Sequence, residues 1–384
     1  MQRRKATFFG LMRNDPCQSA LGFTPHIAGS GVSYNLAFAE FDDQGEAYDN
    51  AQTAAVQAEL DRLLSAEQDA IIAVFTHGWR HDADPKDDNL KHVKELLVKI
   101  ALRESSEAKP RPVYGIFVCW RGLSFYGNTP VEYTTFWGRQ GAARRISNGS
   151  VRELFGRLRR YRHKRLKGDG GAPMLVIAGH SFGGLIVYSA LEQSLIEAAS
   201  AEAGHIIPSF ADLVLLINPA FEASRYLPVD RLSKLLDNRT NIQLPVFVCA
   251  CANNDLATKY AFLAGNFISA FKQSTRGDLQ RRILNRTVGH VDDFTTHLIS
   301  TANDSFFLQL KHASGVAPLR QANPFWVVRA EKGVINGHSG IWLKPFRDFL
   351  EALLWAKAKT TTGGEDISKR EAALGGVQHL GELL

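Results

Sequence analysis

The sequence has few cysteines and no long apolar run. Only four cysteines occur among 384 residues, and three of them lie within short apolar stretches. No paired cysteine framework is visible, which excludes a disulfide-stabilised secreted scaffold and favours a reducing compartment. The longest apolar runs, such as Val246 to Ala252, are far shorter than the ~20 residues that span a bilayer. We therefore expect no transmembrane helix.

The N-terminus also lacks the features of a secretory signal. Met1 is followed by a basic stretch and a short apolar patch, with no small-residue cleavage site. We expect a cytoplasmic protein, with export by a system that needs no cleaved signal left open.

Neither sign of charge dominates the chain. Lysine and arginine number 45 against 39 acidic residues, a formal net charge of +6. This balance permits an anionic partner without requiring one. With 45% hydrophobic and 22% charged residues, the composition excludes disordered, collagen-like and coiled-coil proteins.

Six short apolar runs end in glycine, asparagine or a polar turn. Runs that do not alternate are typical of strands covered on both faces of a parallel sheet. Between them, apolar residues recur at helical spacing, as from Leu90 to Ile100. This alternation predicts a doubly wound α/β fold with a mostly parallel sheet. The runs are Ala70–Phe75, Val113–Cys119, Met174–Ala178, Leu213–Ile217, Val246–Cys251 and Phe325–Val328.

Other segments depart from this rhythm. The alternating stretch from Tyr34 to Phe41 predicts the edge strand of a hairpin. Residues 256–324 contain scattered aromatics and no clear strand, which predicts a mostly helical cap insertion. We expect a single domain over residues 1–357 that includes this insertion, followed by a flexible tail over residues 358–384.

One motif indicates chemistry directly. Gly179-His180-Ser181-Phe182-Gly183 lies between a predicted buried strand and a predicted helix, which is the Gly-x-Ser-x-Gly nucleophile elbow. The serine of such an elbow occupies a sharp, strained turn, and the flanking glycines let strand and helix approach closely. The helix that follows directs amide N–H groups at developing negative charge. The pattern predicts Ser181 as a nucleophile; the alternative is a glycine-rich turn.

With this motif, the chain resembles the serine esterase and lipase branch of the α/β-hydrolase superfamily. The resemblance extends from about Ile71 to Phe349, most of the chain. It implies an α/β-hydrolase-type sheet and a nucleophile, an acid and a histidine in that chain order, with an oxyanion-hole loop before them. It implies no organic cofactor and no metal.

The resemblance also assigns the oxyanion hole. His77, Gly78 and Trp79 follow the first apolar run, where the family carries a His-Gly pair. This implies that the amides of Trp79 and Phe182 are the two donors, each contributing about 3 kcal/mol in the transition state. His77, Gly78 and His180 are then expected to contact substrate.

A metal site competes for the same loop. His77 and His81 lie close in sequence to four aspartates between residues 82 and 88. No second ligand cluster occurs at a recognisable spacing. A polar loop whose aspartates cap the helix beginning near Asp87 is the favoured interpretation.

For the acid and the base, the resemblance points to two loops. Asp255 follows the run that ends at Cys251 and would fix the histidine tautomer; the alternatives are Glu222 as the acid and a helix N-cap role for Asp255. His338 lies between two glycines ahead of a terminal helical pattern, where the family places its general base. His290, within the insertion, is the alternative.

Residues 139–167 form a strongly basic segment. Eleven arginines and lysines are interrupted by a single acid, Glu153. Apolar residues at helical spacing within it predict an amphipathic helix with a cationic outer face. A solvated outer helix and a surface for anionic lipid headgroups are the two interpretations left open. No nucleic-acid motif or set of stacking aromatics accompanies the charge, so no nucleic-acid partner is expected.

Together these features imply a serine hydrolase that cleaves carboxylic esters, lipid esters included, through an acyl-enzyme intermediate. Its expected partners are a small-molecule or lipid ester substrate and, through the basic helix, an anionic membrane surface. A thioesterase, a peptidase and a non-catalytic interaction protein on the same fold are the alternatives.

Overall fold

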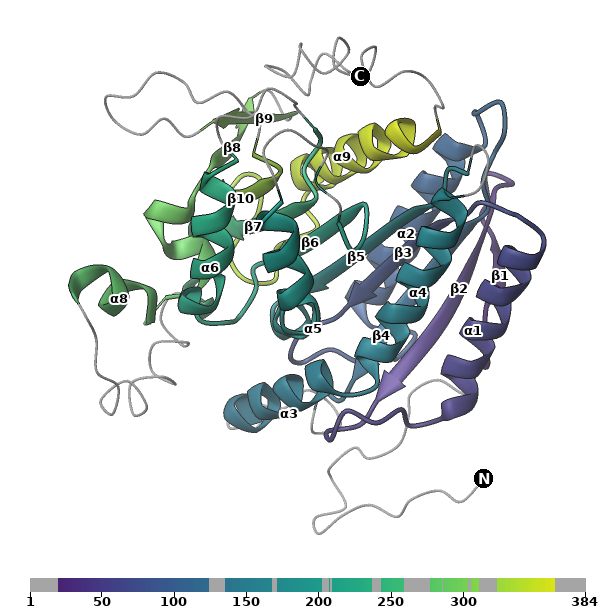
Figure 1. The fold of residues 1–384 in the computed structure, drawn as a ribbon, viewed down its shortest axis with the longest axis horizontal. Helices are drawn as coiled ribbons and strands as arrows, with labels where there is room; N and C mark the ends of the chain where they lie inside the picture. The colour runs from purple at the N-terminus through teal and green to yellow at the C-terminus, as the bar shows by residue number, and fades with distance from the viewer. Residues whose placement is uncertain are drawn as a thin grey trace. The chain divides into compact units, whose positions relative to one another are not determined.

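The computed structural model describes residues 20–123, 135–167, 171–201, 207, 209–236, 243–258, 277–284, 286–302, 305–310 and 323–362. The chain divides into two compact units, Met1–Ala190 and Leu191–Leu384. In the part of each unit that the structure describes, five strands form an α/β arrangement with helices (Figure 1).

The sheet of the first unit has the strand order β1-β2-β4-β3-β5. β1 is antiparallel to β2, whereas β2, β4, β3 and β5 pair with one another in parallel. Every residue of β4 and β5 is buried, as expected for strands covered on both faces. The strands are β1 (Thr24–Ile27), β2 (Ser33–Phe41), β3 (Ile71–Thr76), β4 (Val113–Trp120) and β5 (Met174–His180).

Helices lie on both faces of this sheet. The connection from β2 to β3 crosses the sheet in one direction, and the connection from β3 to β4 returns in the other. Because parallel crossovers are right-handed, their helices α1 and α2 lie on opposite faces. The next crossover runs in the first direction again, and Figure 1 shows its helix α4 beside α1. The helices are α1 (Asn50–Ser65), α2 (Asp88–Glu104), α3 (Phe136–Asn148), α4 (Val151–Leu166) and α5 (Phe182–Ala199).

The second unit has the strand order β6-β7-β10-β8-β9. β6, β7, β10 and β8 pair in parallel, and β8 and β9 form an antiparallel hairpin. The predicted α/β class with a mostly parallel sheet is therefore confirmed. The elements are β6 (Leu213–Ile217), α6 (Ala223–Lys234), β7 (Phe247–Ala252), α8 (Gly277–Leu284), β8 (His297–Ala302), β9 (Ser305–Leu310), β10 (Phe325–Ala330) and α9 (Lys344–Thr362).

The six apolar runs are confirmed as β3, β4, β5, β6, β7 and β10, with ends that differ by at most two residues. The edge-strand prediction for Tyr34–Phe41 is wrong. That strand pairs with β1 on one side and β4 on the other, so β1 is the edge. β1 is short, mostly exposed and contains Pro25, so it lacks the apolar pattern that marks a strand.

The predicted helical insertion is only partly right. Gly277–Leu284 is helical, but β8 and β9 extend the sheet beyond β10. Exposed and buried residues mix along β8 (Ile299 is buried and Thr301 exposed), so the segment has no continuous apolar run. Residues 259–276, 285, 303–304 and 311–322 of the predicted insertion lie outside the described residues.

Near the C-terminus, α9 continues to Thr362, beyond the predicted start of the tail at residue 358. Residues 363–384 of that predicted tail lie outside the described residues. Among the helices that the structure describes, none is long and apolar enough to cross a membrane.

Candidate active site

Ser181 occupies the turn between β5 and α5. Its φ angle is +56°, in the left-handed region that costs a non-glycine residue about 1–2 kcal/mol. Its carbonyl already accepts a helical hydrogen bond from the Leu185 amide at 3.1 Å. A serine held in this strained conformation at a strand–helix junction is the geometry of a nucleophile elbow.

The two motif glycines are required by close backbone contacts. A Cβ atom on Gly179 would lie 2.5 Å from the Gly183 carbonyl oxygen. A Cβ atom on Gly183 would lie 2.1 Å from the Thr76 carbonyl oxygen and 2.6 Å from that of His77. Because these obstructing atoms belong to the backbone, they cannot rotate away. The spacing of the motif thus lets α5 begin directly against the end of β3.

This contact predicts a large loss of stability on adding one methyl group. Gly183→Ala should lower the free energy of unfolding by about 3 kcal/mol, because the backbone of β3 must shift to admit the new Cβ. Gly156→Ala on α4 is the matched control: a Cβ there meets nothing within 4 Å, and the helix should gain about 0.5–1 kcal/mol. Urea titration of both variants measures the difference. Equal stabilities would contradict the described packing of the elbow.

The loop after β3 lies against this elbow. A Cβ on Gly78 would lie 2.8 Å from the Cβ of Ser181 and 3.0 Å from the His180 carbonyl oxygen. The loop is also tied to the end of β4, since the Arg80 amide donates to the Gly122 carbonyl at 2.9 Å. Ser181 and the predicted oxyanion loop are therefore neighbours within the first unit.

Each of the two predicted oxyanion residues is the next residue in the chain after one partner of this contact. Trp79 comes after Gly78, and Phe182 comes after Ser181 as the first residue of α5, where helix N–H groups lack intrahelical acceptors. Their side chains both pack on Phe136, with ring centroids 5.4 Å and 5.1 Å away. The Trp79 indole N–H donates to the Thr135 hydroxyl at 3.2 Å. That their amides stabilise an oxyanion stays a prediction.

His77 is held by the backbone of its surroundings. Its Nδ1 lies 2.9 Å from the Gly78 carbonyl oxygen, and its Nε2 accepts from the Trp120 amide at 3.2 Å. This pairing requires the proton on Nδ1 of a neutral ring. The ring stacks on Trp120 at an interplanar angle of 8°. His77 thus ties the predicted oxyanion loop to the end of β4; that it contacts substrate stays a prediction.

His180 lies close to the same loop. A Cβ on Gly78 would be 3.3 Å from its Nδ1, and its ring meets that of His81 edge-on. His81 in turn bonds Asp87, the residue that caps α2 by accepting from the Asn89 amide. The helix-cap interpretation of this acidic loop is therefore confirmed. A role for His180 in substrate binding stays a prediction.

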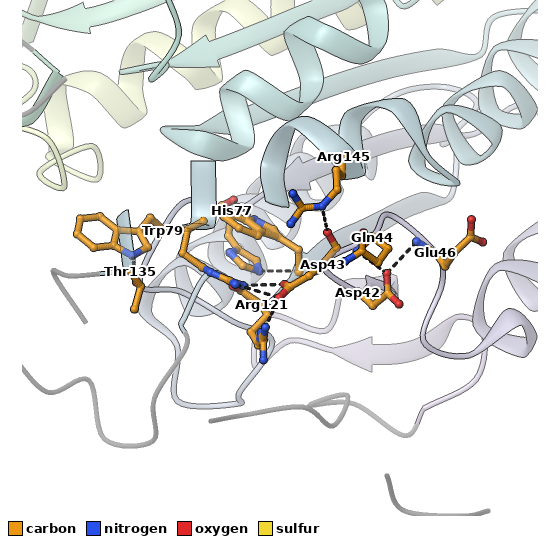
Figure 2. A network of polar contacts seen from close by, with 11 residues as sticks. Asp42, Asp43, Gln44, Glu46, His77, Trp79, Arg121, Thr135 and Arg145 are labelled. Carbon is orange, nitrogen blue, oxygen red and sulfur yellow. Dashed lines mark hydrogen bonds and ion pairs between the residues drawn. The ribbon is translucent and has the colours of Figure 1, made fainter. Parts of the chain in front are cut away.

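A partly buried ionic cluster joins elements at the same end of the sheet, and the sequence did not reveal it. Figure 2 shows Arg121 and Arg145 converging on Asp43, which follows β2. Arg139 of α3 adds a bidentate pair to that carboxylate, at 2.7 and 2.9 Å. Burial acts to raise the pKa of Asp43, but Arg139 and Arg121 outweigh it and lower the pKa. The cluster joins β2, β4 and α3 beside the oxyanion loop.

The second unit contains a carboxylate–histidine pair. His338 Nδ1 lies 2.7 Å from Asp255 Oδ2, and the other carboxylate oxygen accepts from the amides of Ala257 and Thr258 at 3.0 and 3.1 Å. The Asp255 side chain is fully buried, and that of His338 is 23% exposed. A carboxylate bound at Nδ1 is the partner that orients the histidine of a general base; that His338 acts as one stays a prediction.

The environment of Asp255 keeps it ionised. Burial alone would raise its pKa, but the hydrogen bond and charge of His338, together with the Thr258 hydrogen bonds, lower the pKa to about 2. A permanently charged carboxylate at Nδ1 fixes the histidine tautomer and stabilises the imidazolium once it forms.

The two alternative residues lie elsewhere. His290 Nε2 is 3.0 Å from the hydroxyl of Thr258, whose amide binds Asp255. Glu222 is the N-cap residue of α6, and its main chain forms a bridge to Thr287. The structure thus brings together Asp255 and His338.

Two asparagines tether the His338 loop. Asn218 donates to the carbonyls of Gly337 and His338 at 3.1 and 2.9 Å, while its side-chain oxygen accepts from the Ala252 amide at the end of β7. Asn254 accepts from the Gly337 amide at 2.9 Å. These positioning residues went unrecognised in the sequence, although Asn218 directly follows one predicted strand and Asn254 lies three residues after the end of another.

The metal interpretation gains no support here. Among the described residues, no group of three or more histidine, cysteine or acidic side chains is placed to hold a metal ion.

No protein-family model matches the chain, and no curated protein matches its sequence. Among solved structures, acyl-protein thioesterase 2 from Zea mays is similar with 11% identity and a TM-score of 0.29, over 76% of this chain and 94% of that one.

Proposed function

We propose that the protein is a serine hydrolase that cleaves carboxylic esters through an acyl-enzyme intermediate. Ser181 is the nucleophile, His338 the general base and Asp255 the residue that orients it. The amides of Trp79 and Phe182 stabilise the oxyanion, beside Gly78 and His180. The observation that carries the proposal is the φ angle of +56° at Ser181, because strain of this kind persists where function requires it.

The proposed reaction has two half-reactions. Ser181 Oγ bonds to the acyl carbon while its proton passes to His338 Nε2; His338 then gives that proton to the departing alcohol as the ester C–O bond breaks. Water attacks the acyl-enzyme with the same base, which releases the acid and restores the serine. Asp255 accepts from Nδ1–H throughout and remains ionised, in keeping with its pKa of about 2.

A fluorophosphonate probe tests the nucleophile without knowledge of the substrate. The probe phosphonylates only an activated serine, and we expect one label per chain, on Ser181 by peptide mass spectrometry. Ser181→Ala should remove the label, whereas Ser105→Ala, a control on an exposed serine at the end of α2, should retain it. A folded wild-type chain that stays unlabelled would refute the serine mechanism.

The substrate class then follows from a p-nitrophenyl ester series, from acetyl to palmitoyl. The chain length with the highest kcat/KM separates a small-ester esterase from a lipase, and a matched acyl thioester tests the thioesterase alternative. A chain that is labelled yet inactive on all of these would retain the nucleophile and exclude simple esters as substrates.

A further inference from the structure

Positive charge is concentrated in one segment of the first unit. Residues 139–167 carry eleven basic residues against Glu153, a net charge of +10 in a chain whose total is +6. The remaining residues therefore sum to −4. Such an asymmetry produces a directional field, which orients the protein toward a polyanionic partner.

The residues on the inner side of α4 are buried against the rest of the first unit. Leu154, Phe155, Leu158 and Tyr161 are at most 2% exposed, and the Tyr161 hydroxyl donates to the Gln68 carbonyl at 2.8 Å. α4 contacts α1 and β5, in the outer helical layer visible in Figure 1. Only the outer side of the helix remains for a partner.

Nine of the eleven basic residues of the segment fall into two groups. Arg139 and Arg145 bind Asp43, and Arg157 and Arg165 are paired with Glu153 and Asp69; these stabilise the fold. The second group is exposed and, at 3.6 residues per turn, lies along one side of α4. We call it the α4 cationic face: Arg152, Arg159, Arg160, Lys164 and Lys167.

We propose that the α4 cationic face docks the protein on an anionic phospholipid bilayer. Guanidinium groups match phosphate and carboxylate geometry, and each basic residue near such a surface contributes about 1 kcal/mol. Because the apolar side of α4 is buried in the protein, the helix adsorbs on headgroups without inserting into the acyl chains. The docking is therefore electrostatic and sensitive to salt, and it does not depend on whether Ser181 is catalytic.

The structure favours a bilayer over a nucleic acid. Phe155 and Tyr161, the aromatic residues of α4, are each 1% exposed and offer no stacking platform for bases. The helix contacts α1 and β5, and its buried residues extend from Val151 to Tyr161, so it presents a shallow row of side chains instead of a free helix that could enter a groove. A flat charged surface fits that row.

Vesicle sedimentation with the full chain tests the proposal. We expect the protein to sediment with phosphatidylcholine vesicles that contain phosphatidylserine, and not with pure phosphatidylcholine. Raising the salt from about 0.1 M to about 0.5 M should release it. Binding equally to both vesicle types, or to neither, would overturn the proposal. Duplex or single-stranded RNA that binds while the anionic vesicles do not would assign the face to nucleic acid instead.

Variants that lack positive charge test whether the α4 cationic face is the surface that binds the vesicles. The triple variant Arg152→Gln, Arg160→Gln and Lys164→Gln should bind anionic vesicles at least tenfold more weakly, given about 1 kcal/mol per basic residue. The control removes the same charge elsewhere, at the exposed Lys86, Lys91 and Lys332.

The control variant should bind within about threefold of wild type, since charges distant from the contact are screened. Unchanged melting temperatures would show that both triple variants are folded. Equal losses in the two variants would mean that net charge, rather than the α4 cationic face, directs binding.

Discussion

Replacing Ser181 with alanine should lower kcat/KM for ester hydrolysis by about 10,000-fold or more, to the level that binding and the oxyanion hole alone provide. Alanine keeps the strained backbone, so the fold should be retained. Steady-state kinetics on the best p-nitrophenyl ester measures the loss. Retained hydrolysis in the alanine variant would exclude Ser181 as the nucleophile.

Ser181→Gly is the companion variant that separates chemistry from folding. Glycine adopts positive φ without the penalty of a side chain, so at +56° the variant should be more stable than wild type by about 1 kcal/mol. It should nevertheless be as inactive as the alanine variant. A glycine variant that is more stable but inactive would show that the strained residue is also the residue that reacts.

Asp255→Asn should lower kcat/KM by about 1,000- to 10,000-fold, because an amide can hold the histidine in the wrong tautomer. Glu222→Gln is the matched control: it removes a carboxylate of the same unit and should alter the rate less than about tenfold. Kinetics of the two variants under the same conditions decides between the candidate acids. A larger loss in the Glu222 variant would reassign the acid.

The pH dependence of stability provides a second test of Asp255. The pKa of Asp255 is about 2, against about 3.9 for an unfolded aspartate. Its contribution to stability is therefore fully present above pH about 4 and is lost as the pH falls through about 2. In the wild type, a loss of activity on mild acidification must come from proton uptake by another group of the site. Asp255→Asn should lack the loss of stability between these two pH values.

The sequence alone was enough to predict the strands whose residues are all buried. Strands covered on both faces, such as Leu213–Ile217, produce an unbroken apolar run, so their positions could be predicted almost to the residue. The candidate site could be predicted for a related reason: Ser181 and Asp255 each follow such a strand closely. The sequence thus predicted where these strands end and which candidate site residue follows each of them.

Features that depend on contacts between residues far apart in the sequence could not be predicted in this way. β8 and β9 pair as an antiparallel hairpin, but the mixed burial of β8 conceals the strand. The bonds from Asn218 to the His338 loop join residues about 120 positions apart, and those from Arg139 to Asp43 join residues 96 apart. Local patterns carry no information about such contacts.

The tethered loop before His338 also bears on the chemical ageing of the protein. Asn336 precedes Gly337, the dipeptide most prone to deamidation, in which the glycine amide nitrogen attacks the asparagine carboxamide. Asn254 engages both reacting groups: its Oδ1 accepts from the Gly337 amide at 2.9 Å, and its Nδ2 donates to Asn336 Oδ1 at 3.0 Å. Cyclisation to the succinimide needs a free Gly337 nitrogen, so it must first break the hydrogen bond from that amide to Asn254. One side chain therefore protects the loop from gaining an extra backbone carbon as isoaspartate two residues before His338.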